Sequence, residues 1–297
     1  MKVLRVDPRQ TDAAIEAAEG PHMALYDPQI ASNHRLFLFF VGTKGKTEKS
    51  LTLDSAFAER GYHAIALDYE NQVIAVSCVH SLDKTCFDRY REAIVTGAPV
   101  SDKISVNRDN SILNRFNKLL AYLVKHDPEG GWDEFYANGQ PVWSRIVVAG
   151  HSQGAGHAAY LGKMFATDEV LMFSGPQDYL SDLDAPAPWL ARPSATPQSR
   201  YFAFLNVNDP FNEKHQVANC SVLMGLVHPA TPLVQPGEVI SAQEDPQILV
   251  NDADPQHAHG TTILPEFENV WEYFARMGAK NDLKPETLPQ PPPTPRH

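Results

Sequence analysis

The feature that most constrains the fold is a serine, Ser152, inside the run Gly-His-Ser-Gln-Gly at 150–154. The apolar run 145–149 comes directly before it, and 155–161, rich in small residues, follows. A buried strand, a Gly-x-Ser-x-Gly turn and a helix form the context of a nucleophile elbow. Glycine on both sides lets the neighbouring elements approach closely in this sharp turn. We therefore expect a reactive hydroxyl at Ser152 rather than a purely structural glycine turn.

The composition indicates a globular chain with ample core. The 297 residues are 43% hydrophobic and 21% charged, with a formal net charge of −11. This length fits one large domain or two small ones. The acidic balance argues against a nucleic-acid partner and gives no support for binding an anionic membrane, because both are negatively charged. The sequence has no run of about 18 apolar residues, so we expect no membrane span.

The three cysteines leave two states open. Cys78 and Cys86 lie eight residues apart and could close a short loop, which would leave Cys220 over. A disulfide would imply an oxidising compartment, whereas three reduced thiols are the simpler alternative. The first residues lack the apolar segment of a secretory signal. We therefore expect either a cytoplasmic chain or a mature form whose leader has been removed.

Strand and helix patterns alternate along the chain, which predicts an α/β fold with a mostly parallel sheet. Short apolar runs predict the strands, and periodic or capped stretches predict the helices. The expected strands are 36–41, 63–69, 144–149, 170–173, 201–205 and 247–250. The expected helices are near 12–18, 47–60, 84–96, 110–126 and 266–277.

The alternation favours a single α/β domain at 35–283. We expect residues 1–34 to wrap the edge of this domain and the Pro-rich tail, 284–297, to be disordered or extended. The loop-like stretches 176–200 and 229–246 interrupt the alternation, and loops of this length are often lids or binding walls.

Two aromatic residues make 176–200 a candidate wall of a substrate pocket. Tyr179 and Trp189 lie in this proline-rich stretch and could contact an apolar or aromatic part of a substrate. The alternative is that both side chains simply pack in the core.

A serine hydroxyl needs a base to take its proton and a carboxylate to orient that base. After a nucleophile elbow, the acid comes next in the chain and the histidine last. Asp209 follows the strand 201–205 and is the first candidate for the acid, although it could be an ordinary turn residue. Asp178, which follows 170–173, is its rival.

The base should lie in a loop before the last helix, where two histidines compete. His259 is followed by Gly260, which allows the tight turn that a catalytic imidazole needs, so we favour it over His257. No carboxylate–histidine cluster with zinc spacing accompanies the pair, so we expect no metal. His151 lies inside the elbow, and we expect it to line the pocket or to pack.

Acyl transfer places negative charge on the carbonyl oxygen, and preorganised N–H groups stabilise that charge. We expect one donor at the amide of Gln153, directly after the serine. The other should come from the loop 42–46 after the first long strand, with Thr43 as the candidate. This loop ends in Gly-Lys-Thr, but its preceding glycine is too close to Gly45 for a phosphate-binding Walker motif.

These residues make the chain similar to the α/β-hydrolases over roughly 35–278, through the elbow, the strand order and the order Ser152, Asp209, His259. More narrowly, it resembles bacterial esterase-like serine hydrolases with a Gly-His-Ser-Gln-Gly elbow. The resemblance implies a mostly parallel eight-stranded sheet with helices on both faces, and a serine mechanism without a cofactor. The oxyanion loop departs from the lipase pattern, because it reads Gly-Thr-Lys-Gly instead of His-Gly-Gly-Gly.

The resulting hypothesis is an enzyme that hydrolyses a small-molecule carboxylic ester through an acyl-enzyme on Ser152. The alternatives are an amidase, a lactonase or an acyltransferase that uses the same residues, and a binding protein with a hydrolase fold. The sequence favours no particular oligomeric state.

Overall fold

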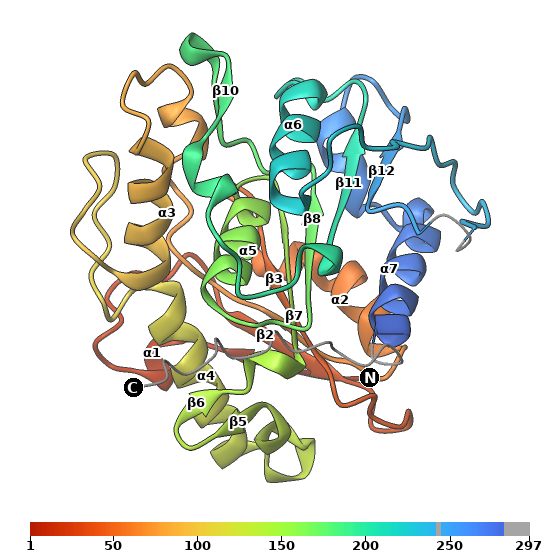
Figure 1. The fold of residues 1–297 in the computed structure, drawn as a ribbon. Helices are drawn as coiled ribbons and strands as arrows, with labels where there is room; N and C mark the ends of the chain where they lie inside the picture. Colours follow the sequence, from red (N-terminus) through yellow and green to blue (C-terminus); the bar gives the residue numbers. More distant parts are fainter. Residues whose placement is uncertain (242–244, 282–297) are drawn as a thin grey trace, which may run out of the picture.

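The computed structural model describes residues 1–241 and 245–281, and a large central sheet dominates it (Figure 1). Its strand order is β1-β2-β4-β3-β7-β8-β11-β12. The strands are β1 (Lys2–Val6), β2 (His22–Tyr26), β3 (Leu36–Phe40), β4 (His63–Ala66), β7 (Ile146–His151), β8 (Glu169–Phe173), β11 (Tyr201–Asn206) and β12 (Ile248–Asn251). β2 runs antiparallel to both neighbours, and the pairs from β4 to β12 are parallel.

Helices cover both faces of the sheet. They are α1 (Pro8–Thr11), α2 (Leu51–Ala58), α3 (Cys86–Thr96), α4 (Ile112–His126), α5 (Gln153–Met164), α6 (Glu213–Met224) and α7 (Glu268–Asn281). α2 and α7 pack together on one side of the sheet, and α3, α4 and α5 lie on the other (Figure 1). The two small hairpins are β5 (Tyr136–Ala137) with β6 (Gln140–Pro141), and β9 (Tyr179–Leu180) with β10 (Ala185–Pro186).

This layering explains the continuous apolar sequence of the central strands. A strand that is covered on both faces has no polar side to present, and β3, Leu-Phe-Leu-Phe-Phe, is buried along its whole length. Phe37 stacks on Phe57 of α2 with ring centroids 3.9 Å apart. Each such buried phenylalanine stabilises the fold by roughly 1.5–3 kcal/mol.

The structure confirms the expected α/β architecture. The ends of its strands and helices differ from the predicted ends by a few residues. The helix predicted near 12–18 is wrong. Pro8 and a capping box between Asp7 and Gln10 start α1 earlier, and the helix ends at Thr11. Beyond it, the Ala17 N–H donates to the Asn110 side chain, and such bonds replace helical ones. The tail 284–297 lies outside the described residues.

Residues 1–34, expected only to wrap the domain edge, supply β1 and β2 and so complete the sheet. The apolar pattern did not predict these two strands, because β1 is partly exposed and β2 contains a buried histidine, His22. Burial lowers the pKa of His22 to about 3, and its neutral ring accepts the Asp68 N–H over 3.0 Å. Helix α6 was also missed, because its apolar residues show no helical periodicity.

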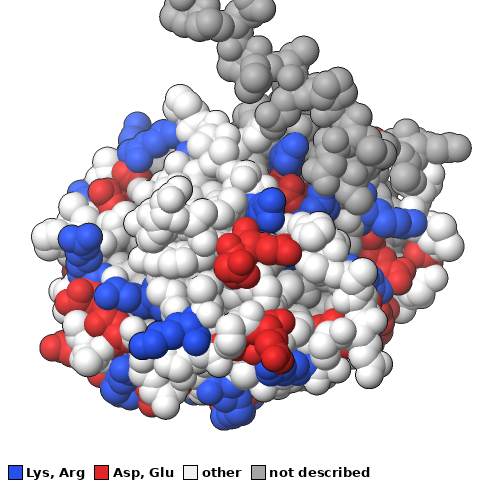
Figure 2. Space-filling model, turned by 90° about the horizontal axis from the view of Figure 1, so that it is seen from below, with Lys and Arg blue, Asp and Glu red and all other residues white. Residues whose placement is uncertain are grey.

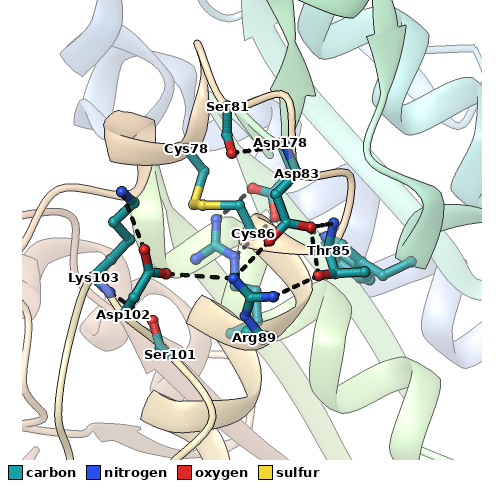
Figure 3. Close-up of a disulfide and its surroundings, with 12 residues drawn as sticks. Cys78, Ser81, Asp83, Thr85, Cys86, Arg89, Ser101, Asp102, Lys103 and Asp178 are labelled. Carbon is teal, nitrogen blue, oxygen red and sulfur yellow. Dashed lines mark hydrogen bonds and ion pairs between the residues drawn. A yellow bond between two sulfur atoms is a disulfide. The ribbon is translucent and has the colours of Figure 1, made fainter.

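Cys78 and Cys86 form a disulfide, so the alternative of three reduced thiols is wrong. Cys220 is a buried free thiol. The bridge joins the short helix Ala75–Cys78 to the first residue of α3 (Figure 3). Arg89 of α3 pairs over 2.6 Å with Asp83, which lies in the loop that the bridge closes, so an ion pair accompanies the covalent link.

The surface carries both signs of charge. Over the face shown in Figure 2, Lys and Arg side chains are interspersed with Asp and Glu. Within residues 1–241 and 245–281, no helix combines the length and the apolar character needed to cross a membrane.

Candidate active site

Ser152 lies in a sharp turn between β7 and α5, with φ +57° and ψ −119°. A positive φ is uncommon outside glycine, and strained backbone of this kind clusters at functional sites. The flanking glycines are required by close packing. A Cβ atom at Gly150 would lie 2.2 Å from the backbone of Gly154, and one at Gly154 would lie 2.0 Å from the Phe40 carbonyl oxygen.

Ser152 borders a cavity of about 560 Å³ at the carboxyl edge of the sheet. This volume lies in the range of small-molecule sites. Its walls combine apolar, basic and imidazole side chains with the backbone of the loop after β3. The lining residues are Phe39, Val41, Gly42, Thr43, Lys44, Gly45, Lys46, Lys49, Ser50, Gln72, Ile74, His151, Ser152, Phe211, His259 and Ile263.

His259 enters the same cavity and is hydrogen-bonded to Asp209. The distance from His259 Nδ1 to Asp209 Oδ2 is 2.8 Å, and the Asp209 side chain is fully buried. Asp209 follows β11, whereas His259 lies in the short helix Ala258–Ile263, before α7. Two loops that are 50 residues apart in the chain therefore meet beside Ser152.

The surroundings of Asp209 favour its ionised form. Burial by itself opposes ionisation, but the hydrogen bond and charge of His259 and the Phe211 N–H together outweigh it and lower the pKa of Asp209. The Phe211 ring also packs edge-on against the imidazole, with centroids 4.6 Å apart. The carboxylate is thus held as an anion beside a positioned histidine.

His151 fixes the backbone of His259 rather than competing with its ring. His151 Nε2 lies 2.8 Å from the His259 carbonyl oxygen, which also accepts the Ser174 hydroxyl. A carbonyl only accepts, so Nε2 of His151 carries the proton. Burial and the neighbouring His259 lower the pKa of His151 to about 4, so this ring is neutral at neutral pH.

The loop after β3 is tied to the start of α5. Thr43 Oγ1 donates to Gln153 Oε1 over 2.6 Å. Asn71 fixes the loop through two hydrogen bonds. Its backbone carbonyl accepts the Lys44 N–H, and its side-chain amide donates to the Gly45 carbonyl. Gln153 is the first residue of α5, so its N–H has no partner within the helix. The backbone of this loop lies close to the serine, since a Cβ atom at Gly42 would lie 3.1 Å from the Ser152 Cβ.

Gln177 is a residue at the site that sequence reasoning missed. Its Nε2 donates to Ser152 Oγ over 3.2 Å and to the Ser174 carbonyl over 3.0 Å. Its sequence signals are its place after the predicted strand 170–173, which also drew attention to Asp178, and its place in the stretch 176–200. In residues 1–241 and 245–281, no three His, Cys, Asp or Glu side chains are grouped so that they could hold a metal ion.

Comparison with known proteins returns structural likeness alone. No protein-family model matches the chain, and no curated protein matches its sequence. Among similar solved structures are three esterases: a cold-adapted esterase from an Arctic intertidal metagenomic library (14% identity, 88% of this chain and 86% of that chain, TM-score 0.42), Est2 of Thermogutta terrifontis (14%, 94% and 91%, 0.45) and the Bacillus cereus carboxylesterase (14%, 91% and 97%, 0.44).

The topology itself decides the fold. The mostly parallel sheet of eight strands with helices on both faces, and the strand–serine–helix turn at its carboxyl edge, match the arrangement that the resemblance implied. The chain has the α/β-hydrolase fold.

Within this α/β-hydrolase fold, the rival acid and histidine lie elsewhere. The Asp178 carboxylate accepts hydrogen bonds from Nε and Nη2 of the buried Arg91, over 3.1 and 2.5 Å. It accepts a third from the Trp189 indole N–H over 2.9 Å. His257 is exposed and bonds to Asp254. The structure therefore brings Asp209, not Asp178, to His259.

Of the two alternatives for the aromatic residues of 176–200, the structure favours packing, because neither Tyr179 nor Trp189 lines the cavity at Ser152. Trp189 is 1% exposed and bonds to Asp178, so it is a core residue. Tyr179 stacks on His215, with centroids 3.8 Å apart, and lines a separate cavity of about 270 Å³. The stretch includes the hairpin β9–β10 and the short helix Pro188–Ala191.

Proposed function

We propose that this protein is a serine hydrolase that cleaves carboxylic esters of small molecules through an acyl-enzyme. The observation that carries the proposal is the 2.8 Å bond between His259 Nδ1 and Asp209 Oδ2 in a cavity that Ser152 also lines. In a neutral imidazole, a carboxylate that accepts from Nδ1 leaves Nε2 without a proton, and this is the tautomer a general base requires.

In the proposed first half-reaction, Ser152 Oγ attacks the ester carbonyl carbon while its proton passes to His259 Nε2. The Gln153 and Thr43 amides stabilise the negative oxygen. The carbon–oxygen bond to the alcohol then breaks, and the alcohol leaves with the proton from His259. In the second half-reaction water attacks the acyl carbon, His259 takes a proton from it, and the acid departs as Ser152 regains its hydrogen.

A fluorophosphonate probe, read out by intact mass and peptide mapping, tests the nucleophile. We expect one covalent adduct on Ser152 and none on Ser152→Ala. The matched control is Ser221→Ala, which changes a serine on α6 outside the cavity and should label like the wild type. Folded wild-type protein that takes up no label would favour a binding protein over an enzyme.

A substrate panel tests the bond that is cleaved. 4-Nitrophenyl esters, matched 4-nitroanilides and small lactones should separate an esterase from an amidase or a lactonase, and added alcohols should reveal acyl transfer. We expect esters to be turned over at least tenfold faster than anilides of the same acid. A higher rate on anilides would replace the ester assignment with an amidase.

A further inference from the structure

We infer that the substrate of this site carries an anionic group, a carboxylate or a phosphate, which Lys44 and Lys49 bind. This rests on the proposed function and specifies its substrate class. Three lysines line the cavity, Lys44, Lys46 and Lys49, whereas none of its lining residues is an aspartate or a glutamate. The contrast is informative because the chain as a whole has 36 acidic and 25 basic residues.

Two of these lysines keep their charge available. Lys46 Nζ is held by Glu19, at 2.5 Å from its carbonyl and 3.4 Å from its carboxylate. Lys44 and Lys49 are exposed, and no ion pair joins either to a described residue. The acid next to Lys49, Glu48, pairs instead with Arg5 over 2.9 Å.

The two free lysines line the same cavity as Ser152. Lys44 directly follows Thr43, the proposed oxyanion donor, and hydrogen bonds to Asn71 hold this loop. Lys49 lies in the short helix Thr47–Ser50, which leads into α2. A substrate whose carbonyl is beside Ser152 would therefore place its other end within reach of these ammonium groups.

The remaining walls indicate the rest of the substrate. Five apolar side chains line the cavity, Phe39, Val41, Ile74, Phe211 and Ile263, and its polar side chains other than the lysines are uncharged residues and the two histidines. A pocket with apolar walls and a few placed charges fits a ligand with an apolar body and one charged end. We therefore assign a small ester with an apolar body and one anionic group, on either the acid or the alcohol part.

Matched ester pairs test this inference. On the acid side, 4-nitrophenyl valerate is compared with the mono-4-nitrophenyl ester of glutaric acid and with its phosphonate-ended analogue. On the alcohol side, 4-carbamoylphenyl acetate is compared with 4-carboxyphenyl acetate and 4-phosphonophenyl acetate. We expect kcat/KM for an anionic member of at least one series to exceed that of its neutral partner by about tenfold, as electrostatic steering allows. The better anion identifies carboxylate or phosphate.

Charge variants and salt identify the lysines as the cause. In Lys44→Gln/Lys49→Gln the ratio of anionic to neutral kcat/KM should fall towards one, and in Lys44→Glu/Lys49→Glu below one. Lys125→Gln, an exposed lysine of α4 outside the cavity, is the matched control and should keep the wild-type ratio. Raising the salt to 1 M should also reduce the ratio, because the screening length falls to about 3 Å.

The outcomes separate the two proposals. Hydrolysis of the neutral esters with a ratio near one in both series overturns the anionic substrate and leaves the serine hydrolase standing. An anionic preference that survives the glutamate variants also overturns the role of Lys44 and Lys49. No hydrolysis of any ester, together with no fluorophosphonate label, overturns the proposed function itself.

Discussion

The side-chain amide of Gln177 donates a hydrogen bond to Ser152 Oγ over 3.2 Å. Because the serine oxygen accepts this bond, its own O–H remains free to be donated to a base. The same amide nitrogen also donates to the Ser174 carbonyl, which fixes the orientation of Gln177. In the proposed mechanism, Gln177 therefore aims the nucleophile.

Replacing Gln177 should slow catalysis without preventing substrate binding. We expect Gln177→Ala to lower kcat by about tenfold to a hundredfold, since loss of one donor at a reacting oxygen costs on this order or more, with KM within about twofold. Steady-state kinetics on a neutral 4-nitrophenyl ester measures both. Gln177→Glu removes the donor but keeps the length, so it should be as slow as the alanine variant. An unchanged kcat in both variants would assign Gln177 a packing role.

Asp209→Asn should abolish most activity while leaving the fold intact. The asparagine would stabilise the wrong imidazole tautomer and would not balance the charge of the protonated ring, which in comparable sites lowers kcat by about 10⁴-fold. Kinetics together with the thermal unfolding midpoint measures the two effects. Activity within tenfold of the wild type would contradict the role proposed for this carboxylate.

Asp178→Asn should have the opposite profile and lose stability. Asp178 and Arg91 form a fully buried pair, and loss of one partner leaves an uncompensated buried charge that costs about 3–5 kcal/mol. Urea unfolding should report this loss, whereas kcat of the remaining folded protein should stay within a few-fold of the wild type. The comparison with Asp209→Asn is closely matched, because both variants make the same chemical change at buried aspartates. If Asp178→Asn were stable but inactive, the two aspartates would have to exchange roles.

Features that depend on local chemistry could be predicted from the sequence. The elbow is one, because two glycines are needed within a single turn, and the buried run of β3 is another. The parallel pairing of the strands from β3 to β12 is a third, because strands and helices alternate there. The positions of Tyr179 and Trp189 could not be predicted, because they depend on tertiary contacts. Tyr179 stacks on His215, and Trp189 donates a hydrogen bond to Asp178. No sequence pattern indicates either contact.

The same distinction applies to the residues around the serine. Asp209 and His259 could be proposed from chain order, but only the folded loops distinguish Asp209 from Asp178, since both follow strands at the same edge of the sheet. Gln177 has no motif of its own, and the lysines at 44 and 49 look like ordinary surface charges in the sequence. Their grouping around one cavity is a property of the tertiary structure.

Asp54, which is hydrogen-bonded to the cavity residue Ser50, should make stability depend on pH. Its carboxyl is completely buried and accepts the Ser50 hydroxyl over 2.8 Å. Burial, only partly opposed by that bond, raises the pKa of Asp54 to about 8. In the unfolded chain the pKa of an aspartate is about 3.9. Between these values the folded state binds more protons, so stability from this group is complete below about pH 4 and is lost as the pH rises to about 8.

Asp54→Asn removes this titration and should therefore stabilise the protein relative to the wild type increasingly as the pH rises. The difference in the urea midpoint between variant and wild type should grow from pH 5 to pH 8 and then level off. The exposed Asp133→Asn is the matched control, and its effect should not vary with pH. A difference for Asp54→Asn that stays constant from pH 5 to pH 9 would mean that the Asp54 carboxyl does not titrate in this range.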